Sequence, residues 1–276
     1  GFAEGISGAE FSGQLRSQAE RFGVEMLQAN DVTRIFSHNN YHCVFTNDGT
    51  EYSARAVLIA TGSHYKKLAV PGEEDYIGAG IHFCATCDGP FYKGMPVAVV
   101  GGGNSATEES LLLVNYVDHV TLLVRGDVLS ASKVIQEKIL SHPKISVRFN
   151  SEVQEFQGAQ SKLKSVIIRD NRTQKTEKIT PSGVFIFIGQ DPNTAFLKDS
   201  GVALDPWGYI VTGHALVHDG NRPQGFENYD PDILESSVPG IFAAGDVRAG
   251  STKQVASAAG EGATAALCIR QYLKEN

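Results

Sequence analysis

Residues 96–106 read PVAVVGGGNSA, an apolar run that leads directly into a glycine-rich turn. The run predicts a buried parallel strand, and a helix is predicted to follow at residues 105–114. In a strand–turn–helix of this spacing, the first glycine permits the turn and the second lets backbone N–H groups approach a pyrophosphate. The alanine lets the helix pack closely on the strand, and the helix N-terminus adds positive potential. We therefore predict a dinucleotide-binding α/β unit whose cofactor contacts are Gly101, Gly103, Asn104, Ser105 and Ala106.

The choice of coenzyme depends on the end of the next predicted strand, at residues 119–124. The strand is followed by Arg125, Gly126 and Asp127, at the position where such units contact the coenzyme ribose. Arg125 would face a 2′-phosphate, whereas Asp127 would accept a hydrogen bond from a free 2′-hydroxyl. Because the two side chains favour different coenzymes, these residues alone leave both NADPH and NADH open.

Upstream of the glycine turn lies CATCDG, residues 84–89. Two cysteines three positions apart can close a small disulfide ring and open it again, and Asp88 is close enough to move a proton. His82 and His64 could tune a thiolate, although lone histidines near loops are usually solvated. A redox dithiol beside a nucleotide loop suggests that electrons move from a nucleotide to a disulfide. The alternative is a reduced structural pair.

Zinc is the other common use of such a cysteine pair, and it needs a second Cys/His pair at ligand spacing. Cys43 and Cys268 stand alone, so we predict no metal site. Four cysteines in 276 residues are also too few for a secreted disulfide framework, which favours a catalytic pair in a reducing compartment.

The order of predicted elements repeats along the chain. A helix is predicted at residues 9–22, then short strands at 32–36 and 42–46 separated by Asn39 and Asn40, then a buried strand in AVLIATG, residues 56–62. Meander strands and the buried strand GVFIFIG follow again between residues 147 and 189. A fingerprint βαβ unit precedes only the second copy. We therefore expect a missing unit of about 30 residues, with its own glycine loop, before the first copy.

The remaining segments connect and close these two halves. Residues 63–80 show little periodicity and are predicted to be a connection between domains. Residues 217–232 form a predicted loop-like insertion, followed by VPGIFAAGDV at residues 238–247. Its buried strand would place Asp246 to bind a sugar or ribityl hydroxyl, the alternative being a helix cap. A helix is predicted at residues 254–272.

Composition excludes several classes of function. The length of 276 residues allows two domains of ordinary size. A formal net charge of −7 and the lack of a basic run argue against nucleic acid as a partner. No apolar run reaches the roughly 20 residues that span a bilayer. Because the chain opens without a signal peptide, we expect a cytoplasmic protein that does not bind membranes.

CATCDG, the turn at 101–106 and three further groups of residues together resemble a bacterial-type (low-molecular-weight) thioredoxin reductase. The resemblance implies an α/β fold with two Rossmann-like, three-layer nucleotide-binding domains, the second inserted in the first, each with a small antiparallel meander. It divides the chain into an FAD domain, residues 1–66 and 193–276, and an NAD(P)H domain carrying the CxxC, residues 67–192. The further groups are the implied FAD contacts: Ala60, Thr61 and Gly62; Gly245, Asp246 and Val247; and Gln254.

The resemblance also implies a homodimer and a reaction path. Hydride would pass from NAD(P)H to FAD, then to the Cys84–Cys87 disulfide, and then to thioredoxin or a thioredoxin-like protein. Cys87 would lie against the flavin, Cys84 would attack the thioredoxin disulfide, and Asp88 would supply and remove the proton. The connections near 66–80 and 190–193 would act as hinges between the two domains.

Two departures from the family qualify this prediction. The chain begins beyond the family's FAD fingerprint loop, so we expect weak or absent FAD binding by these residues alone. NADPH-specific members carry several arginines where this chain has Arg125, Gly126 and Ser130. One cation holds a phosphate less well than a cluster, which predicts a reduced preference for NADPH. The alternatives are a flavin disulfide reductase with another donor, such as ferredoxin, or another partner, and a flavoprotein relic without turnover.

Overall fold

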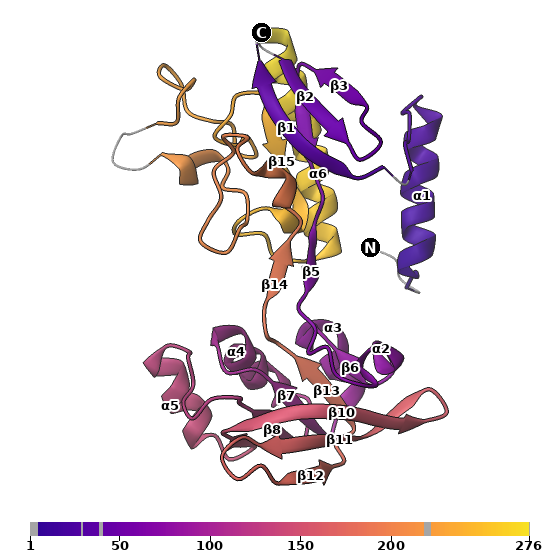
Figure 1. The fold of residues 1–276 in the computed structure, drawn as a ribbon, viewed down its shortest axis with the longest axis vertical. Helices are drawn as coiled ribbons and strands as arrows, with labels where there is room; N and C mark the ends of the chain where they lie inside the picture. The colour runs from indigo at the N-terminus through magenta and orange to yellow at the C-terminus, as the bar shows by residue number, and fades with distance from the viewer. Residues whose placement is uncertain (1–4, 29, 39–40, 218–221, 276) are drawn as a thin grey trace. The chain divides into compact units, whose positions relative to one another are not determined.

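The computed structural model describes residues 5–28, 30–38, 41–217 and 222–275 (Figure 1). The chain divides into unit 1, Gly1–His64 with Asp191–Asn276, and unit 2, Tyr65–Gln190. It passes between the units twice, within β5 (Ser63–Tyr65) and β14 (Gln190–Pro192), which form a two-stranded sheet. The separation expected at Asn39 and Asn40, and residues 218–221 of the expected insertion, lie outside the described residues.

Unit 2 is built on a five-stranded parallel sheet around the apolar run at residues 96–100. Its order is β6 (Ile81–His82), β13 (Gly183–Ile186), β7 (Pro96–Val100), β8 (His119–Leu123) and β9 (Ile145–Arg148). Side chains of β7 alternate between two cores: Val97 and Val99 face one side, Ala98 and Val100 the other. Both faces of the sheet are therefore covered, which explains the continuous apolar run in the sequence.

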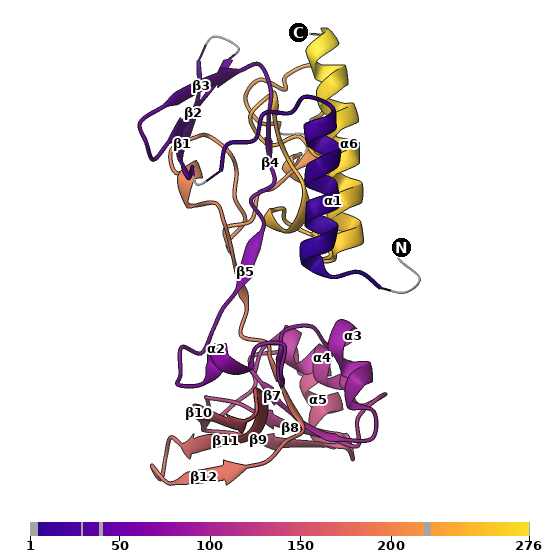
Figure 2. The same cartoon turned by 90° about the vertical axis from the view of Figure 1, so that its right-hand side faces the viewer.

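Helices cover one face of this sheet and a meander covers the other (Figure 2). The helical face includes α4 (Asn104–Leu113) and α5 (Lys133–Ser141), which bury Leu113 and Ile139. The meander of β10 (Ser151–Ala159), β11 (Lys162–Asp170) and β12 (Thr176–Ile179) buries Phe156 and Val166. Unit 2 thus has the three layers expected for the nucleotide-binding domain.

Residues 63–80, predicted to be a connection between domains, contain regular structure that the sequence pattern does not predict. After β5 they form α2 (Glu73–Tyr76) and lead into β6. The Glu73 carboxylate, only 2% exposed, accepts hydrogen bonds from the N–H groups of Leu68 at 2.9 Å and Ala69 at 2.7 Å. The Pro71 carbonyl accepts from Phe156 N at 2.9 Å, which joins the segment to β10. Polar contacts and the irregularly spaced apolar residues Leu68, Val70 and Tyr76 hold residues 65–80 against the core. Because these contacts follow no fixed period, the sequence pattern does not reveal the order of the segment.

Unit 1 combines an antiparallel meander with a short parallel pair. Helix α1 (Gly8–Arg21) begins with a capping box between Ser7 and Glu10. The meander is β1 (Val32–His38), β2 (Tyr41–Thr46) and β3 (Glu51–Ala54), and the parallel pair is β4 (Val57–Ile59) with β15 (Ile241–Ala243). Short 3-10 helices and the C-terminal helix complete the unit: η2 (Ala195–Leu197), η3 (Gly213–Leu216), η4 (Gly245–Val247) and α6 (Val255–Glu275).

Both strands of the parallel pair are shorter than their apolar runs predict. Gly240 and Gly245, with φ of +81° and +76°, bracket β15 because that left-handed backbone does not continue a strand. The core between the pair and the meander contains Ile35, Ile59 and Ile241. On the side of α6, Phe242 meets Tyr272 edge-on at 6.0 Å between ring centroids. Because β4 and β15 pair in parallel, their carboxyl ends lie at the same edge of the sheet.

The core of unit 1 contains a buried histidine on β2. His42 is 3% exposed; its Nδ1 lies 2.8 Å from Ser37 Oγ, and its Nε2 has no hydrogen-bond partner within the described structure. Burial lowers the pKa of His42, and the backbone of Pro239 offsets part of this effect. The folded protein therefore favours neutral imidazole, whereas in the unfolded chain the His42 imidazole takes up a proton at about pH 6.5.

We predict that acidification destabilises the protein through His42. The stability that is present above about pH 6.5 should fall, by at most about 1.4 kcal/mol per pH unit, as the pH drops toward the lowered folded-state pKa. Urea unfolding of wild type and His42→Gln between about pH 5.5 and 7.5 should show the wild type losing about 1 kcal/mol more than the variant.

The comparison with a variant is needed because burial raises the pKa of Glu235. Its contribution to stability changes with pH in the opposite direction. A His119→Gln variant serves as the matched control, because the His119 ring bonds Ser146 at 3.0 Å in an exposed position. Parallel pH curves for wild type and His42→Gln would contradict the prediction.

Candidate functional site

The two cysteines of CATCDG are joined on a single helical turn. Cys84 follows β6 and caps α3 (Ala85–Asp88), where its Sγ accepts a hydrogen bond from Cys87 N at 3.1 Å. The S–S distance is 2.03 Å and the Cα atoms lie 5.3 Å apart. Cys87 is exposed, Cys84 is half-buried, and Ala85 between them is fully buried. The short helix thus presents one sulfur to the surface while anchoring the ring in the core of unit 2.

Asp88, the last residue of α3, faces a partly buried histidine. Its Oδ2 lies 3.4 Å from His82 Nδ1, with side chains 30% and 10% exposed. His82 Nε2 in turn lies 2.6 Å from the Tyr92 hydroxyl in η1 (Gly89–Tyr92). Burial lowers the pKa of His82, opposed by Asp88, and raises that of Tyr92, with Asp88 adding to the rise. The interpretation of His82 as a solvated loop histidine is therefore wrong, because β6 buries it.

A second carboxyl group, Glu109 on α4, lies behind the dithiol. It faces the backbone N–H of Ala85; burial raises the pKa of Glu109, Glu108 adds to the rise, and the Ala85 contact opposes it. Sequence reasoning missed this residue, because a glutamate within a helix is usually on its exposed face. Two half-buried carboxyl groups, Asp88 and Glu109, thus approach the turn that carries the disulfide.

The glycine turn connects β7 to α4 as predicted, and its residues differ in surroundings. Gly101 has φ of +143°, and a Cβ there would lie 2.4 Å from the Phe187 carbonyl oxygen. A Cβ on Gly103 would meet only Ser130 Oγ, at 3.7 Å. No side chain caps α4, and Asn104 and Ser105 in its first turn are exposed. The uncapped N-terminus of a ten-residue helix beside an open glycine fits the pyrophosphate of a dinucleotide.

The residues expected to contact the coenzyme ribose lie on an exposed loop after β8. Arg125 and Asp127 are both exposed, and the Arg125 carbonyl accepts from Asn171 Nδ2 at 3.2 Å. Ser130 is held back toward the turn: its Oγ donates to the Gly102 carbonyl at 3.2 Å. Lys133, the first residue of α5, is exposed as well. Arg125 and Lys133 therefore lie in solvent, and the loop could accommodate the coenzyme ribose of either NADPH or NADH.

The expected FAD contacts gather at the carboxyl edge of the parallel pair in unit 1. After β4, Thr61 Oγ1 donates to the Asn193 carbonyl at 2.7 Å, and Asn193 Nδ2 returns a bond to the Thr61 carbonyl at 2.7 Å. After β15, Gly245 N donates to Glu261 of α6 at 2.7 Å. Ala60 and Thr61 are exposed, Gly62 is half-buried, and Gly245 and Val247 are buried. The structure thus brings the two predicted groups to the same edge.

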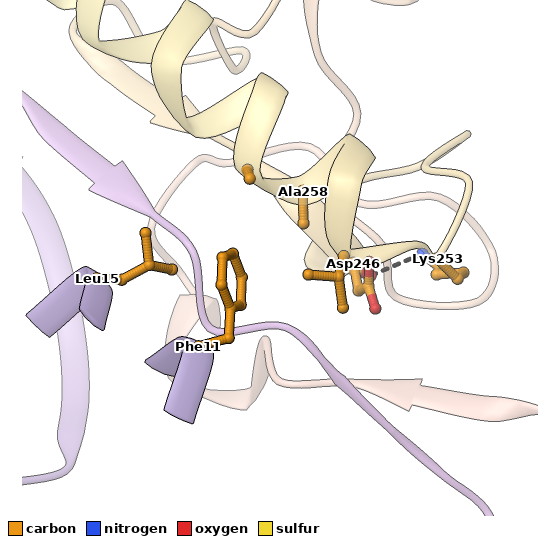
Figure 3. A pocket seen from close by; sticks show the side chains of 7 residues that line it. Phe11, Leu15, Asp246, Lys253 and Ala258 are labelled. Atoms are coloured by element: carbon orange, nitrogen blue, oxygen red, sulfur yellow. Dashed lines mark hydrogen bonds between the residues drawn. The ribbon is translucent and has the colours of Figure 1, made fainter. Parts of the chain in front are cut away.

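Asp246 lies at a cavity of about 360 Å³ that is also lined by Phe11, Leu15, Lys253 and Ala258 (Figure 3). Lys253 Nζ donates to the Asp246 carbonyl at 2.7 Å and lies 4.1 Å from the centroid of the Tyr209 ring. Burial lowers the pKa of Lys253, an effect that Asp246 opposes. Gln254 is exposed immediately before α6. A carboxylate beside an apolar cavity at a helix N-terminus fits a hydroxyl-bearing part of a flavin nucleotide.

Among the described residues, no three His, Cys, Asp or Glu side chains are grouped so that they could hold a metal ion. None of the helices within the described ranges combines the length and the apolar character needed to cross a membrane.

Comparisons with known proteins agree with this arrangement. The sequence model of the family described as pyridine nucleotide-disulphide oxidoreductase matches residues 3–262. Thioredoxin reductase of Treponema pallidum (strain Nichols) is 38% identical over 273 residues, which cover 99% of this chain and 81% of that protein. Thioredoxin reductase of Bacillus subtilis (strain 168) is 35% identical over 272 residues, covering 99% and 79%.

Solved structures are similar over the same extent. The crystal structure of thioredoxin reductase from Streptococcus pyogenes MGAS5005 has a TM-score of 0.86 at 36% identity, covering 98% of this chain and 82% of that one. Thioredoxin reductase from Giardia duodenalis has a TM-score of 0.86 at 30% identity, covering 99% and 84%. These likenesses confirm the predicted fold class and the resemblance drawn from the motifs. The chain belongs to the pyridine nucleotide-disulphide oxidoreductase family.

Proposed function

We propose that this protein is an FAD-dependent NAD(P)H:disulfide oxidoreductase that reduces thioredoxin or a thioredoxin-like protein. The observation that carries the proposal is the Cys84–Cys87 disulfide on an exposed helical turn, with Cys87 fourteen residues before Gly101 in the glycine turn of a dinucleotide-binding unit. The relatives named thioredoxin reductase support the choice of partner. In this proposal unit 2 binds NAD(P)H and unit 1 binds FAD.

The described residues fit both cofactors. The open N-terminus of α4, with Gly103, Asn104 and Ser105, would hold the nucleotide pyrophosphate. The edge formed by residues 60–62 and Gly245–Val247, with Gln254, would hold FAD beside the cavity at Asp246. When bound, the two cofactors supply a pair of electrons, delivered by the nicotinamide as hydride.

The chain's own residues then carry out thiol–disulfide exchange. Two electrons break the Cys84–Cys87 bond, and Asp88 gives one sulfur a proton while the other remains a thiolate. The Cys84 thiolate attacks one sulfur of the partner's disulfide, which forms a mixed disulfide and releases the other sulfur as a thiolate. Cys87, deprotonated by Asp88, attacks Cys84 and displaces the reduced partner. The ring is closed again, Asp88 has recovered its proton, and two electrons have passed to the partner, whose two thiolates take their protons from solvent.

The test uses the purified full-length protein with oxidised thioredoxin and each candidate electron donor in turn. We expect reduction with a reduced nicotinamide nucleotide at a rate on the order of 1–100 per second, which is ordinary for enzymes. Reduction with reduced ferredoxin alone would replace the donor in the proposal and leave the dithiol chemistry intact. No reduction with any donor, in protein that carries flavin, would favour the alternative of a flavoprotein relic without turnover.

A preference of less than about tenfold in kcat/KM for NADPH over NADH is the expected result for the donor. Arg125 is exposed and stands without the arginines of NADPH-specific members, so its bond to a 2′-phosphate is screened by solvent. Arg125→Gln should lower kcat/KM for NADPH by about threefold to tenfold and leave NADH unchanged, since a single exposed contact contributes about 1 kcal/mol.

Gly126→Arg should raise the preference, because it adds a second cation next to the first. Lys178→Gln, which removes an exposed cation on β12, is the matched control and should change neither rate constant. A wild-type preference for NADPH above about tenfold, or about 1.4 kcal/mol, would contradict the prediction.

Several further features belong to the same proposal. We place the protein in the cytoplasm, because a reducing compartment is where a catalytic CxxC cycles between its two states. The family resemblance also implies a homodimer. We expect partners to be proteins with an accessible disulfide rather than nucleic acids, consistent with the net charge of −7. Light scattering of the full-length protein checks the dimer.

A further inference from the structure

A short chain of polar groups runs inward from the dithiol. Asp88 at the end of α3 faces His82 on β6, with 3.4 Å between Oδ2 and Nδ1. His82 Nε2 lies 2.6 Å from the Tyr92 hydroxyl in η1. The three residues belong to three consecutive elements, and the fold gives each ring nitrogen of His82 a polar partner.

When Asp88 is ionised, the protons on these three side chains have one consistent arrangement. An ionised carboxylate only accepts, so the proton that faces Asp88 must be on His82 Nδ1. Burial keeps His82 neutral by lowering its pKa, so Nε2 is then an acceptor. Tyr92 must donate to it, and its raised pKa keeps the hydroxyl proton in place. The Tyr92 hydroxyl therefore selects the His82 tautomer that can donate to Asp88.

Packing holds the imidazole in that position. The His82 ring lies 5.3 Å from the Tyr92 ring and 5.3 Å from the Phe185 ring, between centroids. Tyr92 and Phe185 also meet edge-on at 5.7 Å, so the imidazole is enclosed by two aromatic side chains. Its side chain is 10% exposed, whereas that of Asp88 is 30% exposed. The carboxylate of Asp88 is thus the more exposed of the two groups, and the histidine is the packed one.

From this geometry we infer that His82, oriented by Tyr92, is a positioning residue that holds the Asp88 carboxylate and sets the pH range in which the Cys84–Cys87 pair reacts. The inference rests on the proposed role of Asp88 as the proton donor to the dithiol. In this inference His82 acts through Asp88 rather than on the sulfurs themselves.

The consequence for the proton transfer follows directly. When Asp88 gives its proton to a sulfur, it becomes a carboxylate, and the Nδ1–H of His82 stabilises that charge. Without this donor, the carboxylate that forms would be stabilised less, and Asp88 would transfer its proton less readily. The alkaline limb of the rate should then move to higher pH while the maximal rate falls. Glu109, which faces Ala85 N–H from α4, is the other titratable group at this turn and is left unchanged by the test.

Four variants of the full-length holoenzyme test the inference. His82→Leu removes both nitrogens, His82→Asn keeps an N–H near the position of Nδ1, and Tyr92→Phe removes only the hydroxyl. His119→Asn is the matched control, since its ring contacts Ser146 on β9 in the same unit. Two measurements are made on each: the rate of iodoacetamide alkylation of the reduced dithiol between about pH 5 and 9, and kcat and KM for thioredoxin over the same range.

We expect His82→Leu to shift the alkylation profile and the alkaline limb of kcat by at least about 0.5 pH unit, and to lower kcat about tenfold with KM changed less than twofold. Tyr92→Phe should produce part of the same shift, because the Nδ1–H tautomer is no longer selected. His82→Asn should restore most of the wild-type profile, and His119→Asn should match wild type throughout.

Identical pH profiles for wild type and His82→Leu would overturn the inference, as would equal defects in His82→Leu and His82→Asn. If His82→Leu does not fold, Tyr92→Phe decides, and an unshifted profile in that variant overturns the inference. Alkylation requires neither thioredoxin nor a nicotinamide donor. A shifted alkylation profile in a protein that reduces no thioredoxin would therefore support the His82 inference and reject only the proposed function.

Discussion

Replacing Cys87 with serine should lower thioredoxin reduction at least about a thousandfold, because a serine oxygen can neither accept the electron pair nor displace a mixed disulfide. Cys87 is one half of the only disulfide within the described part of the chain, and the other cysteines, Cys43 and Cys268, are free. Electron transfer from the nucleotide to a small dye acceptor should continue, since it bypasses the dithiol. The two assays on one preparation measure both effects.

The two sulfurs are not equivalent in the structure, which allows a sharper version of the experiment. Cys87 is exposed, whereas Cys84 is half-buried and accepts the Cys87 N–H. Sequence resemblance nevertheless assigns the attack on thioredoxin to Cys84. The trap is a thioredoxin that lacks its resolving cysteine and carries thionitrobenzoate in a disulfide on the remaining cysteine. Reduced Cys87→Ser should therefore displace the thionitrobenzoate and form a stable mixed disulfide through Cys84, and Cys84→Ser should form none.

Trapping through Cys87 instead would show that the exposed Cys87, and not the half-buried Cys84, attacks thioredoxin. Dye reduction lost together with thioredoxin reduction would show a defect in flavin or nucleotide binding rather than in the dithiol. Cys43→Ser is the control: Cys43 is buried on β2 in unit 1 and should not affect either assay.

Periodic and motif-like features of the chain were predictable from sequence. The buried strand β7, the turn at 101–106 and the two meanders each follow from local residue patterns. These patterns are visible because burial on a strand or helix repeats with a fixed period. The Cys84–Cys87 disulfide was equally predictable, since the two cysteines are three residues apart, which matches one helical turn.

Features that depend on single polar contacts were not predictable. The buried Glu73 organises residues 65–80 through two backbone N–H groups, and nothing in its neighbours distinguishes it from a surface glutamate. The sequence singled out His82 near the thiols but not its burial between Asp88 and Tyr92, and Glu109 approaches the dithiol only because α3 and α4 pack together in unit 2. Long-range packing of this kind leaves no local pattern, so Glu109 and the contacts of His82 emerge only from the structure.

Gly101→Ala is the substitution for which we expect the largest loss of stability, about 3 kcal/mol, because it combines backbone strain with a steric clash. Its φ of +143° is costly for any residue with a Cβ, and that Cβ would lie 2.4 Å from the Phe187 carbonyl oxygen and 2.7 Å from Ala106 Cβ. Phe187 N bonds the Val100 carbonyl at 2.9 Å, so relieving the clash would separate β13 from β7. Urea unfolding of the full-length protein measures the loss.

Gly103→Ala is the matched control, and it separates the two reasons for glycine in this turn. Gly103 has an ordinary φ of −89°, and its Cβ would have 3.7 Å to the nearest atom, Ser130 Oγ. Its stability should therefore stay within about 0.5 kcal/mol of wild type, while nucleotide affinity measured by calorimetry should fall about tenfold, because a methyl group would occupy the approach to the pyrophosphate. Equal stability of Gly101→Ala and wild type would contradict the steric argument. Unchanged nucleotide affinity in Gly103→Ala would remove the α4 N-terminus as the binding site. Gly101 is thus expected to maintain the fold, and Gly103 to leave room for the ligand.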